Sequence, residues 1–224
     1  MADRLQFLSR FKETMVSSSC KSYDSGDIIT NKQSKDLFIY VIEEGVIKVS
    51  DSTSGGRART LLLLNKGEAF PLIWAFDHPE SVVYTYEALD KVKILSASLS
   101  EFKEALSTDP AFTKSALQMF VNLSWDAMER LKGMQMPFTY ERLLSILPYI
   151  CAKVGSKISG QRFRIPKKFS QQEIADLLGV TRESVSSHYQ KALKNEVIID
   201  KDGLRVLDLS KIPSECIFNT WFKT

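Results

Sequence analysis

The residue types best suited to chemistry stand in the segment SQQEIADLLGVTRESVSSHY, which begins at Ser170. Ser170 is followed three residues later by Glu173, which is a capping box at a helix start. Thr181 is a second N-cap residue, and Arg182 and Glu183 come directly after it. An arginine can donate two hydrogen bonds to O6 and N7 of guanine, and a glutamate can accept one from N4 of cytosine. The pair therefore suits the recognition of base edges, provided that its helix can enter a groove.

Two short helices are predicted to position this pair. Each start is followed by apolar residues at helical spacing, and Gly179 separates the two runs. These residues are Ile174, Ala175, Leu177 and Leu178 in the first run and Val185, Tyr189 and Leu193 in the second. Two helices joined by a tight glycine turn form a helix-turn-helix, in which the N-terminal residues of the second helix enter the major groove of DNA.

The expected DNA contacts come from both helix starts, from the outer side of the second helix and from neighbouring lysines. Helix starts favour phosphate through free N–H groups and the helix dipole, and lysines add positive charge. The residues are Lys168, Ser170, Gln171, Thr181, Arg182, Glu183, Ser186, Ser187, Gln190 and Lys191.

Charge is distributed unevenly along the 224 residues. The net charge is +3, but 14 Lys and Arg against 9 acidic residues after residue 137 give +5 there and −2 in the remainder. A solvated surface is the alternative explanation for so small an excess. The excess favours DNA binding only because the helix-turn-helix lies within it.

Further elements flank the two helices. The runs EVIID and LRVLDL are joined by Lys201-Asp202-Gly203, and Asp-Gly is a strong hairpin signal, so a wing is predicted at residues 197–209. Before the helix pair, FTYERLLSILPYICAKVG predicts a helix, and SGQRFRIPKKF predicts a strand pair or an extended arm.

The region from about Tyr23 to Ala97 predicts many short strands. Apolar runs recur as IIT, LFIYVI, VIKVS, TLLLL, VVYTY and VKIL, with turn signals between them. The Gly55-Gly56 pair suits a tight hairpin. This pattern indicates an antiparallel barrel or sandwich.

A long helix is predicted at residues 110–136, starting at Asp109-Pro110 and ended by Pro137. Two apolar lines run along it and are expected to form one broad face. They are Leu117, Val121, Ser124, Met128 and Leu131, and Phe112, Ala116, Met119 and Leu123. This face could pack on its own β-domain or on the same helix of a second chain. A length of ~40 Å at 1.5 Å per residue favours a dimer, because a small barrel would hardly cover it.

The segment FSQQEIADLLGVTRESVSSHYQKALKNEVI resembles the winged helix-turn-helix of the Crp/Fnr family of bacterial transcription regulators. The family pattern of a hydroxyl residue, Arg, Glu, Thr or Ser, and Val falls on residues 181–185, and IYVIEEGVIKVS and LLLLNKGEAF resemble the glycine-marked strands of the family's β-roll. The resemblance implies an α+β chain with a cyclic-nucleotide-binding-like β-roll at 1–108, a long dimerisation helix at 109–137 and a winged helix-turn-helix at 138–224. It implies that Arg182 and Glu183 read bases. Ser187 stands where family members commonly carry a second arginine, which predicts a different DNA target.

The effector pocket of the family maps onto Gly67, Glu68, Phe70 and Leu72. In members that bind cyclic nucleotides, the glutamate of a Gly-Glu pair holds the ribose, and an arginine about ten residues later neutralises the phosphate. Here Glu80 and Ser81 stand in the place of that arginine, and residues 69–90 contain no Lys or Arg. A phosphate without a cation binds poorly. We therefore expect no cyclic AMP binding by the usual mode, a turn role for Glu68, and core packing or an apolar ligand around Phe70.

Other functional classes find little support. Three scattered cysteines and two histidines offer no disulfide framework, metal site or iron–sulfur cluster, and no nucleophile–base pair is evident, so we expect neither an enzyme nor a cofactor. No signal peptide or membrane span is evident, which predicts a cytoplasmic protein. The expected partners are double-stranded DNA, a second copy of the chain, RNA polymerase and an unidentified effector. The alternative is a ligand- or partner-binding β-roll protein whose helical domain mediates protein contacts.

Overall fold

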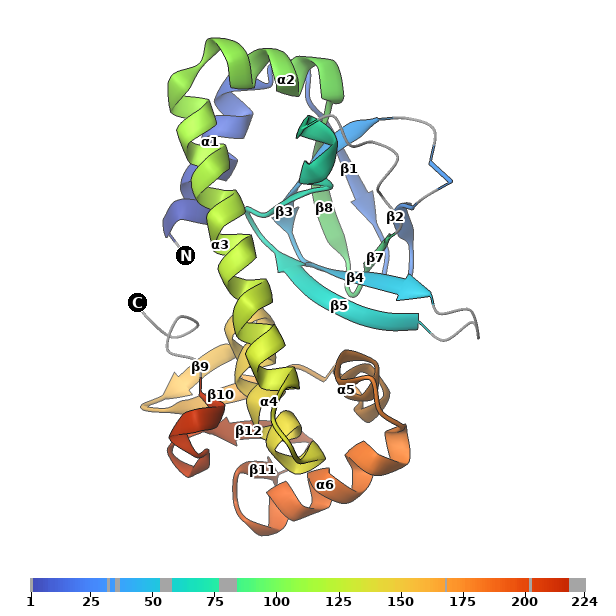
Figure 1. Ribbon diagram of the computed structural model, residues 1–224, viewed down its shortest axis with the longest axis vertical. Helices are drawn as coiled ribbons and strands as arrows, with labels where there is room; N and C mark the ends of the chain where they lie inside the picture. The colour runs from blue at the N-terminus through green and yellow to red at the C-terminus, as the bar shows by residue number, and fades with distance from the viewer. Residues whose placement is uncertain are drawn as a thin grey trace. The chain divides into compact units, whose positions relative to one another are not determined.

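The computed structural model describes residues 2–31, 33–34, 37–52, 58–76, 84–167, 169–201 and 203–217. The chain divides into an N-terminal unit, Met1–Arg57 with Leu61–Trp125, and a C-terminal unit, Ala58–Thr60 with Asp126–Thr224 (Figure 1). The Gly55-Gly56 hairpin, Lys168, Asp202 and the positions Glu80 and Ser81 lie outside the described residues. The domain limits at residues 108 and 137 stay predictions.

Antiparallel strands form the N-terminal unit, as the recurring apolar runs predict. One sheet has the order β1-β8-β3-β6 and the other β2-β7-β4-β5. The strands are β1 (Ser19–Tyr23), β2 (Ile28–Thr30), β3 (Phe38–Glu44), β4 (Val46–Ser52), β5 (Ala58–Asn65), β6 (Ala69–Phe70), β7 (Thr85–Ala88) and β8 (Val92–Ser98). The β-roll is therefore confirmed, with β1 as an additional strand that sequence patterning missed because its residues are mostly exposed.

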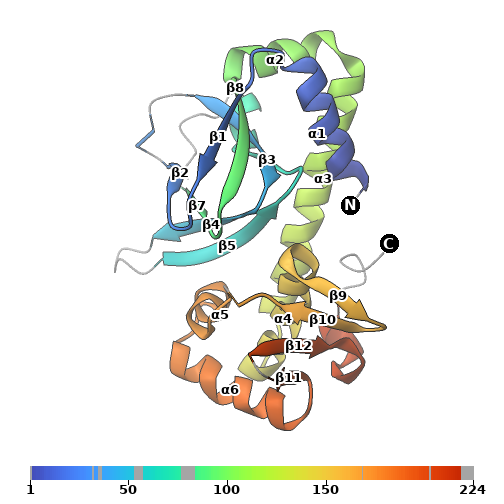
Figure 2. The same ribbon diagram turned by 180° about the vertical axis from the view of Figure 1, so that it is seen from behind.

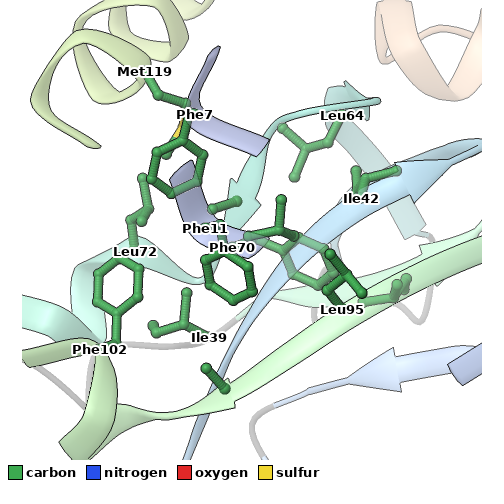
Figure 3. Close-up of a cluster of buried hydrophobic side chains, with 14 of the residues drawn as sticks. Phe7, Phe11, Ile39, Ile42, Leu64, Phe70, Leu72, Leu95, Phe102 and Met119 are labelled. Atoms are coloured by element: carbon green, nitrogen blue, oxygen red, sulfur yellow. The ribbon is translucent and has the colours of Figure 1, made fainter. Parts of the chain in front are cut away.

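A helix that the sequence patterning also missed opens the chain. α1 (Ala2–Thr14) buries Phe7, Leu8 and Phe11, followed by Met15 just beyond its end. The Phe7 ring lies 5.8 Å from the ring of Phe112, centroid to centroid. Figure 3 shows Phe7 and Phe11 among side chains from the strands and later helices. α1 thus belongs to the core of the N-terminal unit.

Two helices follow the last strand of the roll. α2 (Leu99–Thr108) is capped by Ser98, whose hydroxyl accepts a hydrogen bond from the Glu101 N–H. α3 (Pro110–Met134) is capped by Asp109, whose carboxylate accepts from the N–H groups of Ala111 and Phe112 at 2.9 and 3.0 Å. α3 ends at Met134, three residues before Pro137, so the helix is slightly shorter than predicted (Figure 2).

The two apolar lines of α3 do not form one broad face, which corrects that expectation. Phe112, Ala116 and Met119 are buried in the N-terminal unit, whereas the line that starts at Leu117 is exposed. A helix turns 100° per residue, so the centres of the two lines lie roughly 130° apart around the axis. One line packs on the chain's own core, and the other faces away from it.

The C-terminal unit contains the predicted winged helix-turn-helix. A four-stranded antiparallel sheet has the order β11-β12-β10-β9. The elements are α4 (Thr139–Val154), β9 (Ser156–Ser159), β10 (Arg162–Ile165), α5 (Gln171–Leu178), α6 (Arg182–Lys194), β11 (Ile198–Lys201), β12 (Leu204–Asp208) and the 3-10 turns η3 (Leu209–Lys211) and η4 (Ser214–Cys216). The strand pair before α5 is confirmed, and it extends the sheet of the wing.

Candidate nucleic-acid interface

Local hydrogen bonds fix both helix starts. The Ser170 hydroxyl accepts from the Glu173 N–H at 3.2 Å, and the Thr181 hydroxyl accepts from the Ser184 N–H at 3.2 Å. Gly179 ends α5 with φ +64°, a left-handed conformation that glycine adopts without strain. A Cβ there would meet nothing within 4 Å, so the backbone angle, not space, requires glycine. Each capping hydrogen bond joins residues three positions apart, so both helix starts are set by local contacts.

Apolar side chains hold α5 against α6. The predicted residues of α5 are all buried, and Val185 and Tyr189 of α6 are buried with Ala192. Leu193 is only half-buried, so Ala192 takes the interior position that the spacing assigned to Leu193. Burial raises the pKa of Tyr189. The outer face of α6 is left for other contacts.

The predicted base-reading pair lies on that outer face. Arg182 and Glu183 are exposed, and within the described part of the chain neither side chain forms a hydrogen bond or ion pair. The strip Glu183, Ser187, Gln190 and Lys194 runs along the exposed side of α6 at helical spacing. The hydrogen-bonding capacity of these side chains is therefore available to a ligand.

The other predicted DNA contacts surround this strip. Ser170 and Thr181 are exposed, while Gln171 and Ser186 are partly buried. Lys167 reaches the turn of the wing, where its ammonium would be 3.7 Å from a Cβ at Gly203. Gly203 has φ +74°, as the predicted hairpin requires. The structure thus brings the segment before α5 close to the wing turn within the C-terminal unit.

Two arginines that the sequence interpretation did not single out fix this arrangement. Arg205 on β12 donates to the carbonyl oxygens of Phe169 and Pro166 at 2.7 and 2.6 Å, which ties the wing to the loop before α5. Arg130 near the end of α3 is buried and donates to the carbonyl of Leu177 at 2.7 Å, at the C-terminal end of α5. Burial lowers the pKa of Arg130. Sequence spacing gave no signal for either contact because the partners are backbone carbonyls far along the chain.

In the N-terminal unit, the predicted effector residue Glu68 is held by its own chain. Its side chain is fully buried, with Oε1 3.1 Å from Nε of Arg4 and Oε2 accepting from the Asn65 N–H at 2.7 Å. Arg4 also donates to the Asn65 side chain at 3.2 Å. Arg4 lies on α1, and the helical spacing of Phe7, Phe11 and Met15 after it was the signal that could have revealed this helix.

The neighbouring pocket residues are also interior. Gly67 has φ +84°, and a Cβ there would lie 2.4 Å from the Arg4 carbonyl oxygen, so the approach of α1 requires glycine. The Phe70 ring stacks between the rings of Tyr40 and Tyr86, with centroids 5.4 and 4.8 Å away. Leu72 is buried as well. A role for these residues in effector binding stays a prediction.

The described residues hold neither a cluster of metal ligands nor a membrane-spanning helix. No group of three or more His, Cys, Asp and Glu side chains there is placed to hold a metal ion. Among the described helices, none is both long enough and apolar enough to cross a membrane.

Comparisons with known proteins agree with this two-part organisation. A family model described as a cyclic nucleotide-binding domain matches residues 20–109, and one described as a Crp-like helix-turn-helix domain matches residues 141–212. No curated protein matches the chain at a significant level.

Solved structures share the fold along most of the chain. A cyclic nucleotide-binding domain containing protein from Listeria monocytogenes matches with a TM-score of 0.76 and 15% identity, over 93% of this chain and 97% of that one. A mutant of CooA from Carboxydothermus hydrogenoformans matches with a TM-score of 0.73 and 18% identity, over 92% of this chain and 90% of that one. A transcriptional regulator of the CRP/FNR family from Thermus thermophilus matches with a TM-score of 0.69 and 20% identity, over 88% of this chain and 98% of that one.

Proposed function

We propose that this chain, which belongs to the Crp/Fnr family of DNA-binding transcription regulators, acts as a homodimer that reads its DNA site through α6 and does not respond to cyclic AMP. Arg182, Glu183 and Gln190 contact base edges, and Lys168, Ser170, Gln171 and Thr181 contact phosphates. The short Ser187 takes the position of the family's second arginine, so the preferred site differs from the best-known one at the base that this arginine reads.

One observation carries the proposed DNA contact. The Arg182 and Glu183 side chains stand exposed at a capped helix start, without partners among the described residues. Presenting them to DNA therefore breaks no bond within the protein. Each can form a charge-assisted hydrogen bond with a base edge in the major groove, which is stronger than a neutral one.

The exposed line of α3 supports the dimer. Its large apolar side chains are 39% to 60% exposed: Leu117, Phe120, Val121, Trp125, Met128 and Leu131. Leu117, Val121, Met128 and Leu131 follow the three–four spacing of a coiled coil, with Ser124 between them. Exposed apolar groups gathered on one helix face mark an interaction site. A second copy of α3 is the occupant that this spacing fits.

The contacts of Glu68 support independence from cyclic AMP. A ribose hydroxyl at Glu68 would have to displace Arg4 or the Asn65 N–H from a buried carboxylate. Removing one partner from a buried charge is costly. In addition, the sequence supplies no Lys or Arg between residues 69 and 90 for the phosphate. We expect the regulator to work in the cytoplasm with RNA polymerase as its partner, and without enzymatic activity.

Selection of bound duplexes from a random DNA pool tests the proposal. We expect a two-fold symmetric consensus, because a symmetric dimer places its two recognition helices one helical turn of DNA apart. Sedimentation should give a dimer for the wild type and a monomer for Met128→Glu combined with Leu131→Glu. Gln118→Glu, at an exposed polar position on the same helix, is the matched control and should stay dimeric. A monomeric wild type, or a pool without any consensus, would contradict the proposal.

Calorimetric titration with cyclic AMP tests the effector part separately. We expect no heat of binding up to millimolar ligand and no change in DNA affinity. Tight binding would overturn this part alone.

A further inference from the structure

One side of α6 carries a small cluster around an aromatic ring from α4. The Lys191 ammonium lies 4.2 Å from the centroid of the Tyr140 ring. Asn195 donates through Nδ2 to the Tyr140 hydroxyl at 3.2 Å, and the His188 ring lies 6.0 Å from the Tyr140 ring. Tyr140 is the second residue of α4, and the three other residues share one face of α6. The cluster therefore holds a lysine of the recognition helix against a fixed ring.

The ring gives the ammonium of Lys191 a defined place. A lysine side chain on a surface normally samples many rotamers, and a cation over an aromatic face is attracted by the ring quadrupole. Lys191 is exposed, and within the described part of the chain no carboxylate pairs with it. Its three N–H donors can therefore reach an external anion while the ring restrains the stem.

The position of Lys191 around α6 indicates which anion it meets. At 100° per residue, Lys191 lies about 70° from the centre of the strip formed by Glu183, Ser187, Gln190 and Lys194, on the flank nearer α4. A helix with its side chains is about 10–12 Å across and the major groove is about 12 Å wide, so the helix fills the groove. Along the body of α6, residues on the strip meet base edges, and a residue on the flank meets the wall of the groove, which is the phosphate backbone. Arg182 lies off the strip, but it is at the N-terminus, the end of the helix that enters the groove.

We propose that Tyr140 is a positioning residue for DNA binding: its ring holds the Lys191 ammonium against a backbone phosphate beside the groove that α6 occupies. The proposal rests on the proposed function of α6 as the recognition helix. Lys191 lies about 14 Å further along the helix than Arg182, at 1.5 Å per residue. The phosphate contact at Lys191 thus supports the C-terminal half of α6, whereas the phosphate contacts proposed at Ser170 and Thr181 support its beginning.

The salt dependence of DNA affinity tests this assignment. Each phosphate contact contributes roughly 0.9 to the slope of log K against log salt concentration. Because the proposed dimer carries two copies of Lys191, Lys191→Met should reduce the slope by about 2 and weaken specific and non-specific duplexes alike. Tyr140→Leu should reduce the slope in the same direction. Tyr140→Phe keeps the ring and Asn195→Ala deletes only the hydrogen bond, so both should retain the wild-type slope. Lys114→Met, an exposed lysine on α3, is the matched charge control and should also retain it.

A double variant separates positioning from a merely structural role. In the Lys191→Met background, Tyr140→Leu should have no additional effect on the slope, because the ammonium that the ring positions is already gone. Thermal unfolding of every variant is measured alongside, and Tyr140→Met replaces Tyr140→Leu if the latter melts early. An unchanged slope for Lys191→Met, or an additive effect of Tyr140→Leu, overturns the inference. A wild type that binds no DNA instead overturns the proposed function.

Discussion

The β-roll and the recognition helix each carry a glutamate that the family resemblance singles out, and the chain treats the two in opposite ways. Glu68 in the β-roll is buried, and its two oxygens are held by Arg4 and the Asn65 N–H. Glu183 in α6 is exposed beside Arg182, and within the described residues neither side chain has a partner. One region satisfies its polar groups internally, whereas the other presents them to solvent.

This difference bears on how readily each glutamate can take up a ligand. A ligand that binds Glu68 must first break charge-assisted bonds in a low-dielectric interior, and that cost offsets its own contacts. A ligand that binds Glu183 displaces only water. The Gly67-Glu68 pair contacts α1 through Arg4, so a nucleotide bound at Glu68 would compete with that contact.

The largest effect is expected from Arg4→Ala. Removing one partner of a buried ion pair leaves an uncompensated charge and costs about 3–5 kcal/mol. Because the Arg4 side chain is 18% exposed, we expect the lower end, about 3 kcal/mol, for this variant. Urea unfolding followed by circular dichroism measures the loss.

Arg10→Ala is the control on the same helix. Arg10 pairs with Glu13 at 3.3 Å on the surface, where such pairs contribute about 0–1 kcal/mol. Equal losses for the two variants would show that Glu68 is not held as described.

The next effect concerns DNA affinity alone. Arg182→Ala should weaken binding to the selected site by about 2 kcal/mol, because a bidentate contact to guanine is lost. Its free energy of unfolding should stay within about 0.5 kcal/mol of the wild type, as is usual for an exposed side chain without partners. Fluorescence anisotropy on the selected duplex and on duplexes changed at single base pairs measures both affinity and preference. Unchanged preference would remove Arg182 from the set of base-reading residues.

A smaller loss is expected at the start of the recognition helix. Thr181→Ala removes the hydroxyl that accepts from the Ser184 N–H, and loss of such a cap costs about 1 kcal/mol of stability. Ser187→Ala, on the exposed strip of the same helix, should change the free energy of unfolding by less than about 0.5 kcal/mol. Chemical denaturation of the two variants side by side checks this. If both lose the same amount, the cap contributes nothing specific.

The smallest effect is expected at the surface of the β-roll. Hydrogen bonds from Lys12 and Lys93 lower the pKa of Glu43 from 4.5 to about 2. Because the folded pKa is the lower one, the contribution of Glu43 is present above the unfolded value and is lost as pH falls through about 2. The stability difference between wild type and Glu43→Gln should therefore narrow between pH 5 and pH 2, and added salt should reduce it at pH 5. A difference that stays constant with pH would contradict this.

Local sequence signals predicted the helix-turn-helix well. These signals depend only on neighbours within one or two helical turns. They are the capping residues Ser170 and Thr181, the left-handed Gly179, and the exposed residues that follow Thr181. The strands of the β-roll were predicted for a similar reason, since alternation and turn residues are local. Where burial was shallow, as in β1, the pattern was too weak to detect.

The contacts that distinguish the candidate sites were not predictable in this way. Arg4 and Glu68 are 64 residues apart, and no pattern in either segment points to the other. Tyr140 and Lys191 meet only because α4 packs on α6. The two apolar lines of α3 were visible, but only burial showed that one of them packs inside the unit while the other is exposed.

Sequence patterns alone specified the order of most elements, the two capped helix starts and the residues that face outward from α6. These depend on backbone hydrogen bonds and side-chain periodicity over a few residues, which every segment carries with it. The partners of the charged side chains became known only from the tertiary structure. Glu68 pairs with Arg4, the Arg130 guanidinium donates to a carbonyl at the end of α5, and the Lys191 ammonium lies over the Tyr140 ring. Such pairings depend on the closing of long loops around a packed core, and their partners have no fixed separation along the chain.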